Sequence, residues 1–176
     1  MSSPIFLVGM PGAGKTHWGR VWAETYDRKF TDLDALVEVM EEATIPEIFE
    51  TRGERGFRDA EQRALTYLLE RVDGNSLIAC GGGTPAFDDN MACMLRAGLV
   101  VYLHASVERL AQQLIESPKA RPLVAAGRDV ASLVPFIEKV LAMRRPFYEQ
   151  AQVTLEVEAL TEATFAEILS TCTSRP

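Results

Sequence analysis

The residues best suited to chemistry lie near the amino terminus, where a glycine-rich loop ends in a lysine and a threonine. Residues 9–16 read GMPGAGKT and fit the phosphate-loop (P-loop) pattern G-x-x-x-x-G-K-[ST]. Glycines let backbone N–H groups converge on an anion, and a following helix adds the positive end of its dipole. In such a loop Lys15 reaches the β- and γ-phosphates of a nucleotide, and the Thr16 hydroxyl binds Mg²⁺. The sequence suggests no structural partner for Lys15.

A chance glycine turn is the alternative for this loop. An apolar run of strand length, Ile5–Val8, precedes it, and apolar residues at helical spacing follow it. This context favours a nucleoside triphosphate as the ligand.

Two aspartates, Asp32 and Asp34, follow a short run that is typical of a strand. Residues two apart on an extended chain point to the same side, and ligands of open α/β sheets gather at the carboxyl ends of the strands. One carboxylate can support Mg²⁺ through water while the other accepts a hydrogen bond from a substrate hydroxyl. A solvated loop or a helix cap explains the pair equally well.

An arginine and a glutamate are three residues apart in the segment FRDAE, residues 57–61. Arg58 and Glu61 would share one helix face, and a guanidinium held by a carboxylate is suited to binding a substrate carboxylate. The spacing alone favours an ordinary surface ion pair, worth about 0.2–0.5 kcal/mol.

Three glycines, Gly81, Gly82 and Gly83, directly follow an apolar run at 77–80. A backbone without side chains lets a ligand approach closely and leaves N–H groups available to bind it, although a flexible turn has the same composition. We expect the neighbouring Cys80 to be a buried thiol without a nucleophilic role.

Short apolar runs alternate with helical patterns along the chain, which predicts an α/β fold with a parallel sheet covered by helices on both faces. A capping box of the type S/T-x-x-E indicates a helix start at Thr44. Residues 116–129, with two prolines and a glycine, form the most irregular stretch. The expected strands are 5–8, 29–32, 76–80, 99–103 and 153–157, and the expected helices are about 18–26, 57–69, 132–148 and 162–169.

The length of 176 residues is most simply one domain. A formal net charge of −7 disfavours a nucleic-acid or anionic-membrane partner. The three cysteines suggest neither a disulfide framework nor a zinc site. No apolar run approaches the roughly 18 residues of a membrane helix, and no signal-like segment opens the sequence, so a cytoplasmic protein is expected.

Six motifs together resemble the shikimate kinase family in order and approximate spacing, over about residues 5–155. They are GMPGAGKT, DLD, FRDAE, GGG, RPL at 121–123 and R-x-x-x-Y at 144–148. The resemblance implies a three-layer P-loop kinase fold, related to nucleoside monophosphate kinases. It implies a five-stranded parallel sheet in the order 2-3-1-4-5, flanked by helices and carrying a mobile lid. It also implies transfer of the γ-phosphoryl group of ATP to the 3-hydroxyl of shikimate, the fifth step toward chorismate and the aromatic amino acids.

The same resemblance implies roles for individual residues. The residues that would contact the nucleotide are Gly12, Ala13, Gly14, Lys15, Thr16, His17 and Arg121. Those that would contact shikimate are Asp34, Arg58, Glu61, Gly81, Gly82, Gly83 and Arg144. Thr16 would bind Mg²⁺ directly and Asp32 through water. The catalytic residues would be Lys15, Asp34 and Arg121, with Asp34 taking the hydroxyl proton and Arg121 meeting the transferring phosphate from the lid.

The resemblance further implies a single domain over 1–176, with a substrate-binding segment at about 33–61 and a lid at about 112–129. His17 departs from the family, because Ser or Thr is usual there. Leu114 stands where many members carry an arginine that stacks on adenine, and residues 156–160 lack the usual adenine loop. No adenine contact is therefore assigned.

Two other functions stay open at this point. One is a related small-molecule kinase such as a gluconate kinase, and the other is a non-catalytic P-loop switch that controls a partner surface. The expected ligands are ATP, Mg²⁺ and shikimate, with no nucleic acid or membrane and a monomer as the default.

Overall fold

The structure, a computed structural model, describes residues 3–116 and 129–173. The strands are β1 (Ile5–Val8), β2 (Lys29–Asp32), β3 (Ser76–Ala79), β4 (Leu99–His104) and β5 (Val153–Glu156). The helices are α1 (Lys15–Thr25), α2 (Leu33–Glu41), α3 (Ile45–Leu69), α4 (Asn90–Ala97), α5 (Val107–Glu116), α6 (Val130–Tyr148) and α7 (Thr164–Thr173). Two 3₁₀ turns, η1 (Thr84–Ala86) and η3 (Val157–Ala159), complete the described elements.

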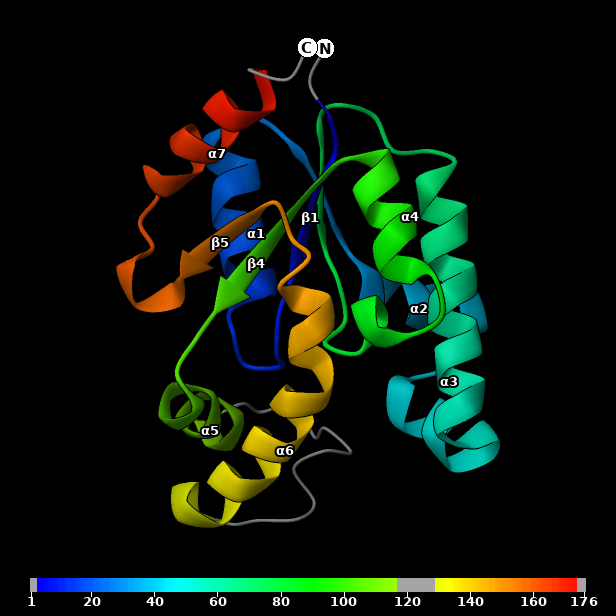
Figure 1. The fold of residues 1–176 in the computed structure, drawn as a ribbon. Coiled ribbons are helices and arrows are strands. Elements are labelled where there is room, and N and C mark those ends of the chain that lie inside the picture. The colour runs from blue at the N-terminus through cyan, green and yellow to red at the C-terminus, as the bar shows by residue number, and fades with distance from the viewer. Residues whose placement is uncertain (1–2, 117–128, 174–176) are drawn as a thin grey trace.

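The strands form one parallel sheet in the order β2-β3-β1-β4-β5, which confirms the predicted fold class. Every residue of the central strand β1 is fully buried, as expected when helices cover both faces of a parallel sheet. Figure 1 shows α1 and α7 on one face and α3 and α4 on the other. Trp22 of α1 stacks on Phe165 of α7, with ring centroids 5.2 Å apart.

Helices α2, α4 and α5 have no counterpart among the helix ranges given above, and the bounds of α1 and α3 differ from the expected ones. Helix α1 begins at Lys15, directly after the glycine loop, whereas apolar spacing indicated a start near residue 18. Helix α3 runs from Ile45 across a kink at Gly53, where φ is 67° and ψ is −174°, a conformation that glycine alone adopts readily. The capping box at Thr44 is confirmed, because Glu47 Oε2 accepts the Thr44 N–H at 2.7 Å.

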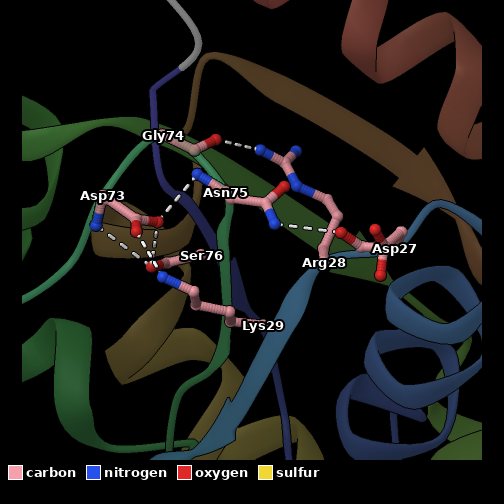
Figure 2. Close-up of polar contacts among 7 residues, drawn as sticks. All are labelled: Asp27, Arg28, Lys29, Asp73, Gly74, Asn75 and Ser76. Carbon is pink, nitrogen blue, oxygen red and sulfur yellow. Dashed lines mark hydrogen bonds and ion pairs between the residues drawn. The ribbon is translucent and has the colours of Figure 1, made fainter.

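A polar cluster joins the amino-terminal ends of β2 and β3 (Figure 2). Lys29 Nζ lies 2.6 Å from Asp73 Oδ2, and Asn75 Nδ2 donates to the Asp27 carbonyl at 2.9 Å. These contacts fix the register of β2 at one edge of the sheet. They thereby determine where the last residue of β2, Asp32, lies at the carboxyl ends of the strands, beside the end of β3.

The irregular stretch predicted at 116–129 falls mostly outside the described residues. Residue 116 ends α5, and Asp129 caps the start of α6, with its Oδ1 accepting the Ser132 N–H at 2.8 Å. Within the described ranges no helix is both long and apolar enough to cross a membrane.

Candidate active site

A cavity of about 430 Å³ opens at the carboxyl ends of β1, β2 and β3. Its walls come from the loop before α1, the segment Asp32–Asp34, the first residues after β3 and the last turn of α5. Three separate sequence motifs, the glycine loop, DLD and GGG, therefore meet at this edge of the sheet, where ligands of α/β folds bind.

The glycine loop packs tightly against the neighbouring strand. Gly9 has a φ of 142°, and a Cβ there would lie only 2.6 Å from the Leu103 carbonyl oxygen. Lys15 is buried beneath the loop, and its Nζ donates to the carbonyls of Gly9 at 2.8 Å and Met10 at 2.9 Å. The expectation that Lys15 has no structural partner was wrong, because the side chain folds back over its own loop. The ammonium is thus held where a phosphate oxygen can replace a carbonyl.

The remaining loop residues predicted to contact the nucleotide occupy two environments. Gly12, Gly14, Thr16 and His17 line the cavity. Ala13 is buried, and its N–H donates to the Met10 carbonyl at 3.1 Å, which closes the turn. The site therefore presents both loop backbone and side chains to a ligand.

Asp32 links the glycine loop to α2. Its Oδ2 accepts a hydrogen bond from Thr16 Oγ1 at 2.6 Å, and its Oδ1 accepts the N–H groups of Asp34 at 3.0 Å and Ala35 at 3.3 Å. The helix-cap interpretation is thus correct for Asp32, and the second carboxylate oxygen still faces the P-loop threonine. The helix-cap bonds of Oδ1 therefore orient the carboxylate so that Oδ2 points toward Thr16.

The Thr16–Asp32 pair is the part of the site that could hold a metal ion. Among the residues that the structure describes, no group of three or more His, Cys, Asp or Glu side chains forms a metal site. An ion here would take its other ligands from water and phosphate, which is how Mg²⁺ is commonly bound in phosphoryl-transfer sites. The residues present fit that ion.

Side chains from α2 and α3 lie against the glycine triplet. A Cβ on Gly81 would lie 2.3 Å from Glu61 Oε1 and 2.8 Å from Asp34 Oδ1, and a Cβ on Gly83 would lie 2.4 Å from the Arg58 guanidinium. Any larger residue at 81 or 83 would displace these side chains. The triplet is therefore a close-packed backbone wall, which excludes the flexible-turn interpretation.

Arg58 and Glu61 form a buried pair. Arg58 Nη1 donates to Glu61 Oε2 at 2.6 Å, with the arginine side chain 13% exposed and the glutamate side chain 0% exposed. The prediction of an ordinary surface ion pair was wrong, because the face of α3 that carries these two residues is turned toward the glycine triplet. The other Glu61 oxygen accepts a hydrogen bond from the Thr84 hydroxyl. Sequence reasoning missed Thr84, whose only signal was a hydroxyl residue next to the triplet.

Helix α6 brings Arg144 and Tyr148 to the other side of the triplet. The buried Tyr148 hydroxyl donates to the Gly82 carbonyl, and its ring stacks on Tyr102 at 5.1 Å. Burial raises the pKa of Tyr148, which keeps the hydroxyl protonated, while the neighbouring Arg144 guanidinium partly opposes this shift. Arg144 Nη1 is buried and makes no hydrogen bond to the part of the chain that the structure describes. An anionic ligand could supply the missing acceptor.

Two further residues singled out in the sequence, Cys80 and Leu114, lie in or near this region. Cys80 is buried with Sγ 3.5 Å from Met94 Sδ, and burial raises the pKa of its thiol, so the thiol is not activated. Leu114 lines the cavity from α5. Arg121 lies outside the described residues, as does the lid segment from 117 to 128.

Comparisons with known proteins agree on one family. A family model described as "Shikimate kinase" matches residues 11–173. The chain is 41% identical over 165 residues to shikimate kinase of Parabacteroides distasonis. The aligned region covers 93% of this chain and 94% of that protein.

Solved structures give the same result. The crystal structure of shikimate kinase from Bacteroides thetaiotaomicron has a TM-score of 0.87 at 35% identity, covering 96% of this chain and 98% of that one. Shikimate kinase from Acinetobacter baumannii in complex with shikimate has a TM-score of 0.86 at 35% identity, covering 99% of this chain and 94% of that one. The chain belongs to the shikimate kinase family.

Proposed function

We propose that this protein transfers the γ-phosphoryl group of ATP to the 3-hydroxyl of shikimate, giving shikimate 3-phosphate and ADP. The observation that carries the proposal is the convergence of two partly buried arginines and one aspartate on the backbone wall beside the P-loop. Shikimate is a small carboxylate with several hydroxyls, so it needs an anion clamp and a hydroxyl-binding acid. Arg58 and Arg144 provide the first, and Asp34 provides the second.

On the donor side, Lys15 exchanges its two carbonyl acceptors for oxygens of the β- and γ-phosphates. Its charge then stabilises the negative charge that develops during phosphoryl transfer. Thr16 would hold Mg²⁺ directly and Asp32 would hold it through water. When bound, the ion neutralises phosphate charge and helps align the γ-phosphate. Backbone N–H groups of Gly12, Gly14 and neighbouring loop residues complete the phosphate cradle.

On the acceptor side, Asp34 orients the reacting hydroxyl and accepts its proton as the new P–O bond forms and the bond to ADP breaks. Arg58 and Arg144 bind the carboxylate of shikimate. The backbone at Gly81, Gly82 and Gly83 forms the surface on which the ring lies. These roles rest on the geometry around the triplet.

The lid at about 112–129 and its Arg121 stay predictions from the sequence. Arg121→Ala should lower kcat more than it raises the KM for shikimate, because a contact made to the transferring group forms late in the reaction. The monomeric state and a cytoplasmic location likewise rest on sequence composition alone.

Release of ADP from Mg·ATP in the presence of shikimate, quinate or gluconate tests the proposed function. We expect release to depend on shikimate and to be far slower with the other two acids. Faster release with gluconate would favour the sugar-acid kinase alternative. Nucleotide binding without release in any mixture would favour the switch alternative.

A further inference from the structure

Thr84 lies at the start of η1, immediately after the glycine triplet, and is fully buried. Its backbone is fixed twice, since its N–H donates to the Gly81 carbonyl at 3.2 Å and its carbonyl accepts Asn90 Nδ2 at 3.0 Å. Its hydroxyl donates to Glu61 Oε1. A buried side chain with this much anchoring can hold its hydrogen-bond partner in one orientation.

Glu61 needs such an anchor because it is a fully buried carboxylate. Its Oε2 accepts Arg58 Nη1 at 2.6 Å, and its Oε1 accepts the Thr84 hydroxyl. The same Oε1 lies against the Cα of Gly81, next to Asp34. A buried carboxylate that lost one of its two donors would rotate or draw in water to recover it. Either movement would shift the Arg58 guanidinium away from Gly83.

We infer that Thr84 is a positioning residue that acts through Glu61 on Arg58, and that its hydroxyl sets the affinity of the site for the acceptor's carboxylate. This inference rests on the proposed function, because it takes Arg58 as a carboxylate-binding group. It goes further in assigning a role to a side chain that does not line the cavity. The path consists of two described hydrogen bonds, from Thr84 to Glu61 and from Arg58 to Glu61.

Steady-state kinetics of Thr84→Val, which keeps the shape and removes the hydroxyl, test this inference. We expect the KM for shikimate to rise about tenfold, as for the loss of about one hydrogen bond to a charged group, while kcat and the KM for ATP change less than about twofold. Thr84→Ser restores the hydroxyl and should restore the KM. Thr66→Val is the matched control, because the exposed Thr66 hydroxyl donates to the Gln62 carbonyl within the same helix α3.

A double-mutant cycle separates positioning from a purely structural role. In a Glu61→Gln background, Thr84→Val should change the KM for shikimate by less than about twofold, because the path is already broken. Thr84→Ala replaces the valine variant if that one does not fold. A folded hydroxyl-free variant with the wild-type KM would overturn the inference, as would an equal rise in both backgrounds. If shikimate does not stimulate ADP release by the wild type, the proposed function is overturned instead. The same cycle would then be measured with the acceptor that supports ADP release.

Discussion

Lys15 is a buried cation and Arg58 a partly buried one, and their partners differ in a way that bears on function. Lys15 donates to two neutral carbonyls of its own loop, and a charged phosphate oxygen is a stronger acceptor than either of them. Arg58 is held by the carboxylate of Glu61 through one nitrogen. A guanidinium has five N–H donors, so Arg58 can keep Glu61 and bind a second carboxylate at the same time.

Lys15→Ala is expected to lower kcat by about two to three orders of magnitude, in line with the loss of one preorganised donor to developing charge. The fold should persist, because the apolar side chains of β1 and Trp22 of α1 stay buried in the core. Turnover and circular dichroism measured on the same sample check both points. Lys139→Ala, which removes an exposed lysine of α6, is the control. Near-normal turnover in a folded Lys15 variant would contradict the P-loop assignment.

Arg58→Ala and Arg144→Ala should each weaken shikimate binding by about 1.5–3 kcal/mol, the usual loss for a hydrogen bond to a charged group. ATP binding should be unchanged, because neither side chain lines the phosphate cavity. Titration calorimetry with each ligand separately measures the two effects. Shikimate affinity that is indifferent to both substitutions would exclude this carboxylate site.

At the scale of the elements, the site lies where the carboxyl ends of three strands, the starts of helices α1 and α2, and one 3₁₀ turn meet. Glu61 of α3 lies against Gly81, and Tyr148 of α6 donates its hydroxyl to the Gly82 carbonyl. The same hydroxyl lies 3.7 Å from Met10 Sδ in the P-loop. Tyr148 therefore touches both the donor loop and the acceptor wall. Helix α6 connects the two halves of the site.

Tyr148→Phe keeps the ring stack on Tyr102 and removes only the hydroxyl. We expect a loss of about 0.5–1.5 kcal/mol in the free energy of unfolding, together with a higher KM for shikimate, because the Gly82 carbonyl loses its donor. Urea denaturation and steady-state kinetics measure the two. Tyr102→Phe serves as the control, since it keeps the same stack and leaves Gly82 untouched. Equal effects of the two variants on the KM would argue against this role for Tyr148.

The sequence predicted the elements better than their bounds or burial. The inner strands β1, β3 and β4 could be recognised because they are short, nearly continuous apolar runs, which are typical of buried parallel strands, whereas the edge strands β2 and β5 are only partly buried. The first half of α3 was missed, apart from its capping box, because Gly53 interrupts the helical pattern with a backbone conformation that no periodicity reveals. The burial of Arg58 and Glu61 could not be read from i, i+3 spacing. It depends on which face of α3 meets a triplet twenty residues or more further along the chain.

At the scale of the whole molecule, two tyrosines make the free energy of unfolding depend on pH in the alkaline range. Burial raises the pKa of Tyr102 to about 12 and also raises that of Tyr148 above its ordinary value. A folded-state pKa above the unfolded value of about 10 means that the unfolded chain ionises first, so stability falls as pH rises through that region. Both rings lie in the buried core between β4 and α6.

We expect the urea midpoint of the wild type to fall between pH 9 and 11, as the tyrosines of the unfolded chain ionise with a pKa of about 10. The double variant Tyr102→Phe/Tyr148→Phe should lose less over the same range, although it starts from a lower stability. Denaturation curves at each pH measure the two slopes. Parallel slopes would show that other groups account for the alkaline loss.

The most direct test of the central claim is to identify the product formed from Mg·ATP and shikimate by phosphorus NMR. The account predicts one monophosphate ester, coupled to the ring proton at carbon 3, that accumulates in equal amounts with ADP. ADP accompanied only by inorganic phosphate, or a phosphate ester on another hydroxyl, would contradict it.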